Sequence, residues 1–270
     1  MFLHHYQPLP VLISIGPFSV YWYGFFIALS VIFGFFIGSY LFKKYALTID
    51  AYYDLVFYLV VFGVIGARLW HVFSEFSYYQ KHLLDILKIW HGGLAIHGVI
   101  LAGVLTLWAY SIIKKTNFWL VLDIFAPLLA FGQALGRWGN YFNQELYGRP
   151  TDLAWGIPID LANRLTGFEQ FNYFQPIFIY ESLALLFLLV LLIRLHWIRI
   201  KHSSKHSLFN GGIFLVYLAG YSIIRFFIGF LRIDPQANWL SLRLDQWVSL
   251  LIIIVSLIGF FILRQRQPSR

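Results

Sequence analysis

Seven long apolar stretches constrain the fold of this 270-residue chain more than any other feature. A membrane-spanning helix needs about 20 consecutive apolar residues, and each stretch comes close to that length or exceeds it. The stretches are Phe18–Phe42, Tyr52–Phe73, Gly92–Ile113, Phe118–Trp138, Ile177–Trp197, Phe209–Leu231 and Trp247–Leu263. The composition agrees, because only 12% of the residues are charged, against about 25% in soluble domains. We therefore predict an all-α integral membrane protein with seven transmembrane helices in a single domain over residues 1–270.

The positions of Lys and Arg predict the orientation of these helices, because positively charged loops stay in the cytoplasm. One set of alternate loops carries Lys43, Lys44, Lys114, Lys115, Arg199, Lys201, Lys205, Arg264, Arg266 and Arg270. We therefore expect the N-terminus outside and the C-terminus in the cytoplasm. The first stretch is too long for a signal peptide and lacks a cleavage site, so we expect it to be a retained span. Residues 141–176, between helices 4 and 5, should form a small irregular head on the outer, periplasmic or extracellular face.

Charge and cysteine content exclude several classes of function. The 20 Lys and Arg exceed the 12 Asp and Glu, but they are spread between apolar stretches and form no basic surface. We therefore expect no nucleic-acid partner. The chain contains no cysteine, which excludes disulfides, thiolate metal sites and a cysteine nucleophile of its own.

Ionisable residues inside the apolar stretches are the first candidates for function, because such residues are costly in a bilayer and usually face a cavity or a partner. They are Arg68, His97, Asp123, Arg137, Glu181 and Arg225. On the predicted topology all except Asp123 lie toward the outer ends of their helices. At 1.5 Å per residue, His97 and Arg225 should lie on the order of 10 Å below the outer boundary. Because guanidinium groups bind phosphate bidentately, this layer predicts a site for a phosphate-bearing lipid head group.

Each of these residues taken alone also has a structural explanation. Arg68 or Arg232 can extend to the membrane interface, and His97 can be a core histidine. Tyr23 can belong to an interfacial aromatic belt, and Asp123 can partner an arginine or the backbone. Three arginines and a histidine at similar depth nevertheless favour a binding site.

The segment at residues 136–149 combines glycines with polar side chains at the end of the fourth stretch. It reads G-R-W-G-N-Y-F-N-Q-E-L-Y-G-R, and by itself it also fits a glycine-rich helix exit. The segment resembles the G-R-x-G-N-x-x-N-x-E-x-x-G-R signature of the bacterial prolipoprotein diacylglyceryl transferases. Every fixed position of the signature is present, namely Gly136, Arg137, Gly139, Asn140, Asn143, Glu145, Gly148 and Arg149.

Further segments occur in the order expected for that family, so the resemblance covers nearly the whole chain. They include Tyr21–Gly24, Gly66–Arg68, Gly92–Gly98 and Arg225–Phe227. Two positions depart from the family pattern. Gly229 stands where a glutamate is expected four residues after Arg225, and the segment before Glu181 lacks the expected histidine.

The resemblance implies an enzyme that transfers the sn-1,2-diacylglyceryl group of phosphatidylglycerol to the lipobox cysteine thiol in the signal peptide of a prolipoprotein. This reaction forms a thioether, releases glycerol phosphate and begins lipoprotein maturation. It needs no metal or other cofactor. The partners would be phosphatidylglycerol, the prolipoprotein and the lipid bilayer, and the location would be the bacterial cytoplasmic (inner) membrane, with the active site toward the outer leaflet.

The catalytic candidates are two arginines, a histidine and a tyrosine. Arg137 and Arg225 would hold the phosphate and stabilise its developing charge. His97 would accept the thiol proton, and Tyr23 would orient that transfer or bind glycerol hydroxyls. The substrate-binding candidates are Arg137, Asn140, Asn143, Glu145, Gly148, Arg149, Arg68 and Arg232.

Two other functions use the same arginine layer. A transporter or lipid-binding scaffold would hold the anionic head group without chemistry. A related lipid transferase would keep the phosphatidylglycerol site and use a different acceptor.

Overall fold

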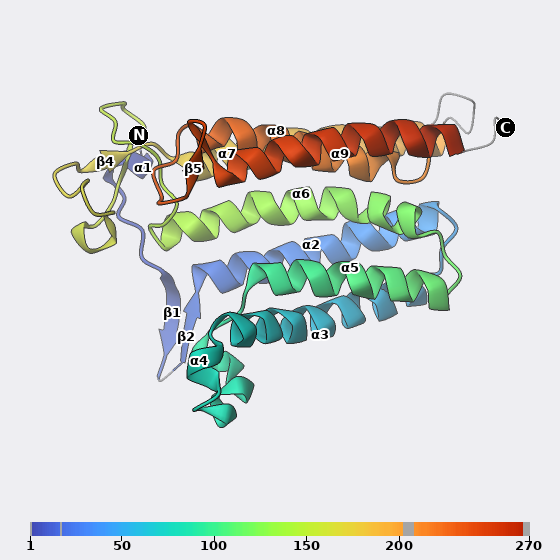
Figure 1. Cartoon of the computed structure of the whole chain (residues 1–270), viewed down its shortest axis with the longest axis horizontal. Coiled ribbons are helices and arrows are strands. Elements are labelled where there is room, and N and C mark those ends of the chain that lie inside the picture. The colour runs from blue at the N-terminus through green and yellow to red at the C-terminus, as the bar shows by residue number, and fades with distance from the viewer. Residues whose placement is uncertain (1, 17, 202–207, 267–270) are drawn as a thin grey trace. The chain divides into compact units, whose positions relative to one another are not determined.

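The computed structural model describes residues 2–16, 18–201 and 208–266, and Lys205 and Arg270 of the predicted positive set lie outside these residues. In this part of the chain seven helices are long and apolar enough to cross a membrane, which confirms the predicted fold class (Figure 1). They are α2 (Trp22–Lys44), α3 (Ile49–Ser74), α5 (Ile96–Ile113), α6 (Phe118–Phe142), α7 (Ile177–Lys201), α8 (Gly212–Gly229) and α9 (Leu244–Arg266).

The helix ends differ from the predicted stretches by a few residues, for local reasons. The residues before Trp22 form strand β2 (Phe18–Tyr21), which pairs antiparallel with β1 (Val11–Ile15). Helix α5 begins only at Ile96, because Gly92 and Gly93 have φ values of 85° and 73°. These values are incompatible with a right-handed helix.

The remaining elements are short and lie between the long helices. They are α1 (Phe2–His5), α4 (Phe76–Tyr79), η1 (Leu83–Leu87), η2 (Ile89–His91), β3 (Ile157–Pro158), η3 (Leu161–Asn163), β4 (Tyr173–Phe174), β5 (Asn238–Trp239) and β6 (Leu242–Arg243). Strand β3 pairs with β4, and β5 pairs with β6, in both cases antiparallel.

The chain forms two compact units. One comprises residues 38–124, and the other, here called the main unit, comprises residues 1–37 and 125–270. In the 38–124 unit, α3 packs closely against α5 at Gly66 and Gly98. A Cβ atom at Gly98 would collide with the carbonyl oxygen of Gly66, so only glycine allows this approach of the two backbones.

The main unit has an apolar core between α6, α7 and α8. Ala126 and Ala130 of α6 lie in one buried cluster with Leu188 and Leu192 of α7 and with Tyr217 of α8. The small alanine side chains let α7 and α8 approach α6. In addition, the Ser182 hydroxyl of α7 donates a hydrogen bond to the Ala134 carbonyl of α6 at 3.0 Å.

A second cluster joins the end of α6 to the segment 141–176, here called the head. Its buried members are Tyr141, Phe142, Tyr147, Ile157, Ile159, Phe174 and Phe178. The N-terminal segment packs against the same cluster through Leu3 and Tyr6, and Gln7 Nε2 donates to Asp160 at 2.8 Å. The attachment of the N-terminus to the head was not predicted from the sequence.

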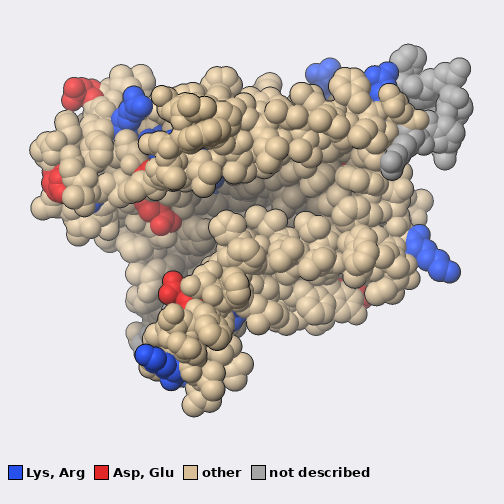
Figure 2. All heavy atoms as spheres, in the orientation of Figure 1, with Lys and Arg blue, Asp and Glu red and all other residues tan. Residues whose placement is uncertain are grey.

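The outward surfaces of the long helices are apolar. Phe187 of α7 is 76% exposed and Leu251 of α9 is 61% exposed. Figure 2 shows a visible surface along the helices with few charged side chains, most of which lie toward the helix ends. Apolar surface on this scale is suited to lipid, so the protein is a multi-pass membrane protein.

Candidate active site

A buried carboxylate on α7 holds the two arginines that the sequence placed at the centre of the site. Arg137 lies in the last turns of α6, and its Nη2 is 2.7 Å from Glu181 Oε1. Arg225 of α8 approaches the other carboxylate oxygen at 3.8 Å. The Glu181 side chain is 0% exposed, whereas those of Arg137 and Arg225 keep 17% and 15% of their surface. The carboxylate is therefore enclosed, while both arginine side chains keep part of their surface exposed.

The ion pairs continue from Arg225 toward the start of α9 and the loop before it. Arg225 Nη2 is 3.0 Å from Asp245 Oδ2, and Arg243 Nε is 3.3 Å from the other oxygen of Asp245. Arg243 also pairs with Asp234 at 2.9 Å, and Asp234 pairs with Arg232 at 2.6 Å. Seven charged side chains thus form one row of alternating sign within the main unit, with four arginines and three carboxylates.

Asp234 lies outside the spanning helices, in the loop between α8 and α9. Partial burial raises its pKa, but the hydrogen bond and charge of Arg232, together with Arg243, outweigh this effect. The net result is a pKa below the ordinary value of an aspartate. Asp234 therefore stays ionised and keeps both arginines in place at neutral pH.

The signature segment forms its own hydrogen-bond network where α6 ends. Arg137 Nη1 donates to the Asn140 side-chain oxygen at 3.3 Å, and Asn140 Nδ2 donates to Glu145 at 2.8 Å. Asn143 Nδ2 donates to the same Glu145 oxygen at 3.3 Å. Glu145 therefore orients both asparagines, and Asn140 connects this network to Arg137.

Two residues with positive φ turn the chain back after α6 and make this network possible. Gln144 has φ 54° and Leu146 has φ 55°, a left-handed conformation that side chains other than glycine seldom adopt. The buried Gln144 side chain donates to the Pro8 carbonyl at 2.9 Å and to Asp160 at 2.6 Å. These bonds fix the turn and therefore the position of Glu145.

The glycines of the signature are explained by close neighbours. A Cβ at Gly139 would overlap the ring of Tyr23, so this tyrosine packs directly on the backbone beside Asn140. A Cβ at Gly148 would lie 2.9 Å from both the Gln175 and Ile177 side chains. Gly148 also forms a β-bridge with Arg232, which ties the head to the loop after α8.

Arg68 has a different environment from the arginines of the main unit. Its Nε donates to the Ile86 carbonyl at 2.8 Å, and Nη1 donates to the carbonyls of Gly92 and Gly93 at 2.8 and 3.0 Å. Its Nη2 reaches the carbonyls of Asp85 and Lys88. All five N–H donors of the guanidinium therefore bind backbone carbonyl oxygens, so Arg68 stabilises the conformation of residues 85–93.

The predicted site residues are divided between the two units. Tyr23, Arg137, Asn140, Asn143, Glu145, Gly148, Arg149, Arg225 and Arg232 belong to the main unit, whereas Arg68 and His97 belong to the 38–124 unit. His97 is exposed in the first turn of α5, and its ring stacks on Trp70 with centroids 5.7 Å apart. Its role as proton acceptor stays a prediction.

The structure adds three charged residues that the sequence did not single out, namely Asp234, Arg243 and Asp245. It also shows what surrounds Gly229, where a glutamate was expected. A Cβ there would lie 2.7 Å from Cγ of Gln246, so the α9 side chain occupies the space. The neighbouring Asp245 supplies a carboxylate to Arg225 from α9.

No group of three or more His, Asp or Glu side chains is arranged to hold a metal ion within residues 2–16, 18–201 and 208–266. The ion-pair row, the signature segment and Tyr23 supply guanidinium, carboxylate, amide and phenol groups. Such a set suits recognition and stabilisation of a phosphate ester.

Comparison with known proteins identifies the family. The sequence profile described as prolipoprotein diacylglyceryl transferase matches residues 10–262. Three relatives bear the name phosphatidylglycerol–prolipoprotein diacylglyceryl transferase. The Synechocystis sp. protein is 38% identical over 97% of this chain and 93% of its own length. The Trichormus variabilis protein is 41% identical over 94% of this chain and 89% of its own length. The Listeria welshimeri protein is 39% identical over 97% of this chain and 92% of its own length. The resemblance found in the signature segment is thus confirmed, and the chain belongs to the prolipoprotein diacylglyceryl transferase family.

Proposed function

We propose that this protein transfers the diacylglyceryl group of phosphatidylglycerol to the lipobox cysteine of prolipoproteins in the bacterial cytoplasmic membrane. The names of its relatives supply the donor and the acceptor. The observation that carries the proposal is the placement of Arg137 and Arg225 on either side of buried Glu181. Two arginines held in place by a shared carboxylate, with partly exposed side chains, suit a phosphate whose negative charge increases during the reaction.

The proposed reaction is a displacement at carbon. The cysteine thiolate attacks the glycerol carbon that carries the phosphate ester, a C–S bond forms, and the C–O bond to phosphate breaks. The electron pair of that bond leaves with the phosphate as glycerol phosphate. The reacting diester carries one negative charge, and the product monoester carries about two near neutral pH. Arg137 and Arg225 would stabilise this added charge.

The other assignments follow from the same scheme and remain proposals. Tyr23, packed on Gly139, would bind glycerol hydroxyls or orient proton transfer. His97, which is exposed in the first turn of α5, would accept the proton of the thiol. The substrate-binding assignments of Asn140, Asn143, Glu145, Gly148, Arg149, Arg68 and Arg232 also stay predictions. The orientation of the protein, with the head on the outer side of the membrane, also stays a prediction.

The test is a transfer assay with purified protein, labelled phosphatidylglycerol and a lipobox peptide. The expected products are a thioether-linked peptide and free glycerol phosphate. Arg137→Ala or Arg225→Ala should slow transfer by at least about 100-fold, the usual effect of removing one preorganised donor. Arg194→Ala, which removes an exposed arginine from α7 outside the ion-pair row, is the matched control and should retain activity.

Lipid binding without any product would refute the proposal in favour of a scaffold or transporter. Near-normal turnover by Arg137→Ala or Arg225→Ala would remove that arginine from the phosphate role.

A further inference from the structure

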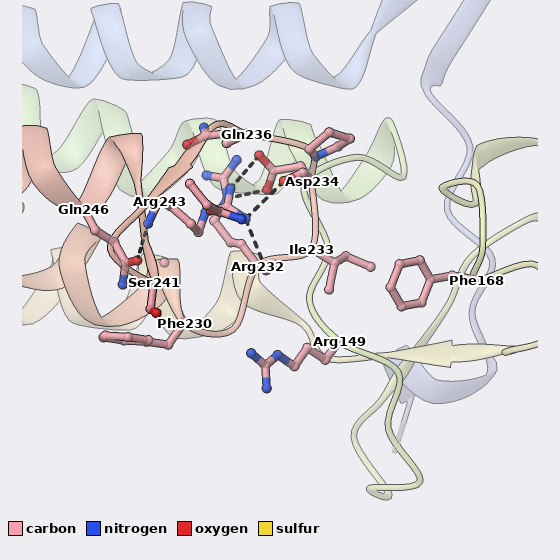
Figure 3. A pocket seen from close by; sticks show the side chains of 13 residues that line it. Arg149, Phe168, Phe230, Arg232, Ile233, Asp234, Gln236, Ser241, Arg243 and Gln246 are labelled. Atoms are coloured by element: carbon pink, nitrogen blue, oxygen red, sulfur yellow. Dashed lines mark hydrogen bonds and ion pairs between the residues drawn. The ribbon is translucent and has the colours of Figure 1, made fainter.

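A cavity of about 440 Å³ lies at the head end of the main unit (Figure 3). Its lining comes from the head, the end of α8, the loop that follows and the start of α9. The lining residues used below are Arg149, Arg232, Asp234, Gln236, Asn238, Ser241, Arg243 and Gln246. Its volume is in the range of ordinary small-molecule sites.

The charges of this cavity favour an anion. Three arginines and one aspartate line it, so the formal charge of the lining is 3 − 1 = +2. Arg232 and Arg243 are both held by Asp234. The Arg149 backbone is fixed, because its N–H donates to the Leu231 carbonyl at 3.1 Å. Arg149 is exposed, and its guanidinium makes no hydrogen bond or ion pair with the other described residues. Figure 3 accordingly draws no dashed line from Arg149 to the other lining residues. Arg149 is therefore available to a ligand.

The cavity is adjacent to the arginines proposed to act on the phosphate. Asp245 pairs with Arg225 on one side and with Arg243, a lining residue, on the other. Gln246 of the lining donates to the Phe226 carbonyl at 3.1 Å, one residue after Arg225. A phosphate that leaves Arg225 would thus meet Arg243 and Arg149 next.

We propose that this cavity binds a phosphate monoester, the glycerol phosphate released by transfer, on its way from Arg225 to water. The proposal rests on the proposed function. A monoester carries about two negative charges at neutral pH, which matches the charge of the lining, whereas a phospholipid diester carries one. The side-chain amides of Gln236 and Asn238 provide partners for the two glycerol hydroxyls.

Direct binding tests this site without requiring turnover. Calorimetry with the protein in nanodiscs should measure binding of glycerol phosphate, of inorganic phosphate and of short-chain phosphatidylglycerol. We expect glycerol phosphate to bind at least about 10-fold more tightly than the diester. Arg149→Gln should weaken binding of glycerol phosphate at least about 10-fold.

Ser241 offers a matched pair of variants. Its side chain is exposed and its φ is 63°, a conformation that both Asp and Asn tolerate. Ser241→Asp should weaken glycerol phosphate binding by adding a negative charge, while Ser241→Asn of the same shape should leave it nearly unchanged. Equal affinities in the wild type, Arg149→Gln and Ser241→Asp would overturn the proposal. Tighter binding of the diester would identify a lipid head-group site instead and would also overturn it.

A transfer assay on the same preparations separates this proposal from the proposed function. Normal transfer by the wild type with no binding of glycerol phosphate would refute the product site alone. If the wild type binds glycerol phosphate through Arg149 but shows no transfer activity, the proposed function would be refuted. The proposal that the bound glycerol phosphate is the product of transfer would then be refuted as well.

Discussion

Arg225 shows how a single side chain depends on carboxylates from other helices. Its guanidinium lies between Glu181 of α7 and Asp245 of α9, although no acidic residue occurs four positions further along its own helix. Burying a charge without a partner costs several kcal/mol, so these carboxylates fix where the arginine points. At the residue scale, the site therefore depends on Asp245 as a positioning residue.

Asp245→Asn should lower kcat for transfer about 10-fold or more with a smaller change in KM, because a misplaced arginine stabilises the transition state poorly. Asp245→Glu should restore part of the lost rate, since it keeps the charge. Steady-state kinetics with phosphatidylglycerol and lipobox peptide provide the measurement. Unchanged kcat in Asp245→Asn would mean that Glu181 alone positions Arg225.

Asp234 should make the stability of the loop after α8 sensitive to acid. Its folded-state pKa is lowered, so it contributes stability above the unfolded value of about 3.9 and loses it as pH falls through the folded value. The difference in melting temperature between wild type and Asp234→Asn should therefore be constant near pH 6 to 7 and shrink below about pH 4. A difference that stays constant down to pH 3 would contradict this account. Exposed Asp152→Asn serves as the control.

The sequence identified some residues of this row and missed others for a physical reason. Arg137, Glu181 and Arg225 stand out because a charge within an apolar stretch is costly and needs explanation. Asp234 and Arg243 lie in the short segment between α8 and α9, outside the apolar stretches, where charges are ordinary. Pairing between distant segments leaves no periodic signal. Only the packing of α9 beside α8 shows that Asp245 faces Arg225.

At the scale of secondary-structure elements, the β5–β6 hairpin carries local strain beside the proposed product site. Asn238 pairs with Arg243 and Trp239 with Leu242, which leaves a two-residue turn. Both turn residues have positive φ, 47° at Leu240 and 63° at Ser241. This is the pattern of a type I′ turn, in which Asn and Gly are the preferred residues.

Leu240→Asn should stabilise the hairpin by about 1 kcal/mol, because the left-handed backbone conformation is sterically less favourable for leucine than for asparagine. The leucine side chain is 70% exposed, so little burial is lost. Thermal unfolding in detergent measures the effect. Leu161→Asn replaces another exposed leucine outside this turn and should give no gain. An equal change in both variants would indicate a general effect of surface polarity.

Element prediction was accurate for the number of spans and inaccurate at some of their ends. Long apolar stretches fixed the number of helices, but Phe18–Tyr21 became a strand because it pairs with Val11–Ile15. Gly92 and Gly93 delayed the start of α5 through their backbone conformation. Neither pairing nor φ is visible in hydropathy alone.

At the scale of the whole molecule, the seven spans and the distribution of Lys and Arg define a testable topology. Exposed Asp152 lies in the head, and exposed Lys44 lies at the end of α2. The positive residues predict that these two positions lie on opposite sides of the membrane.

The absence of cysteine makes single-cysteine labelling straightforward. In intact cells, Asp152→Cys should react with a membrane-impermeant maleimide, whereas Lys44→Cys should react only after permeabilisation. The reverse pattern would invert the proposed orientation. The parent protein, which has no thiol, gives the background.

The alternating charges of the site also affect how the chain enters the membrane during its synthesis. Arg137, Glu181 and Arg225 emerge from the ribosome in that order, one on each of α6, α7 and α8. An ionised residue within a span is costly to insert when it has no partner. Each new helix after α6 brings a charge opposite to that of the helix before it. The insertion machinery can therefore release α6 and α7 into lipid as a pair, and α8 then joins a partner that is already present. Glu181, which positions Arg137 and Arg225 in the folded protein, therefore also lowers the free-energy cost of inserting these arginines into the membrane.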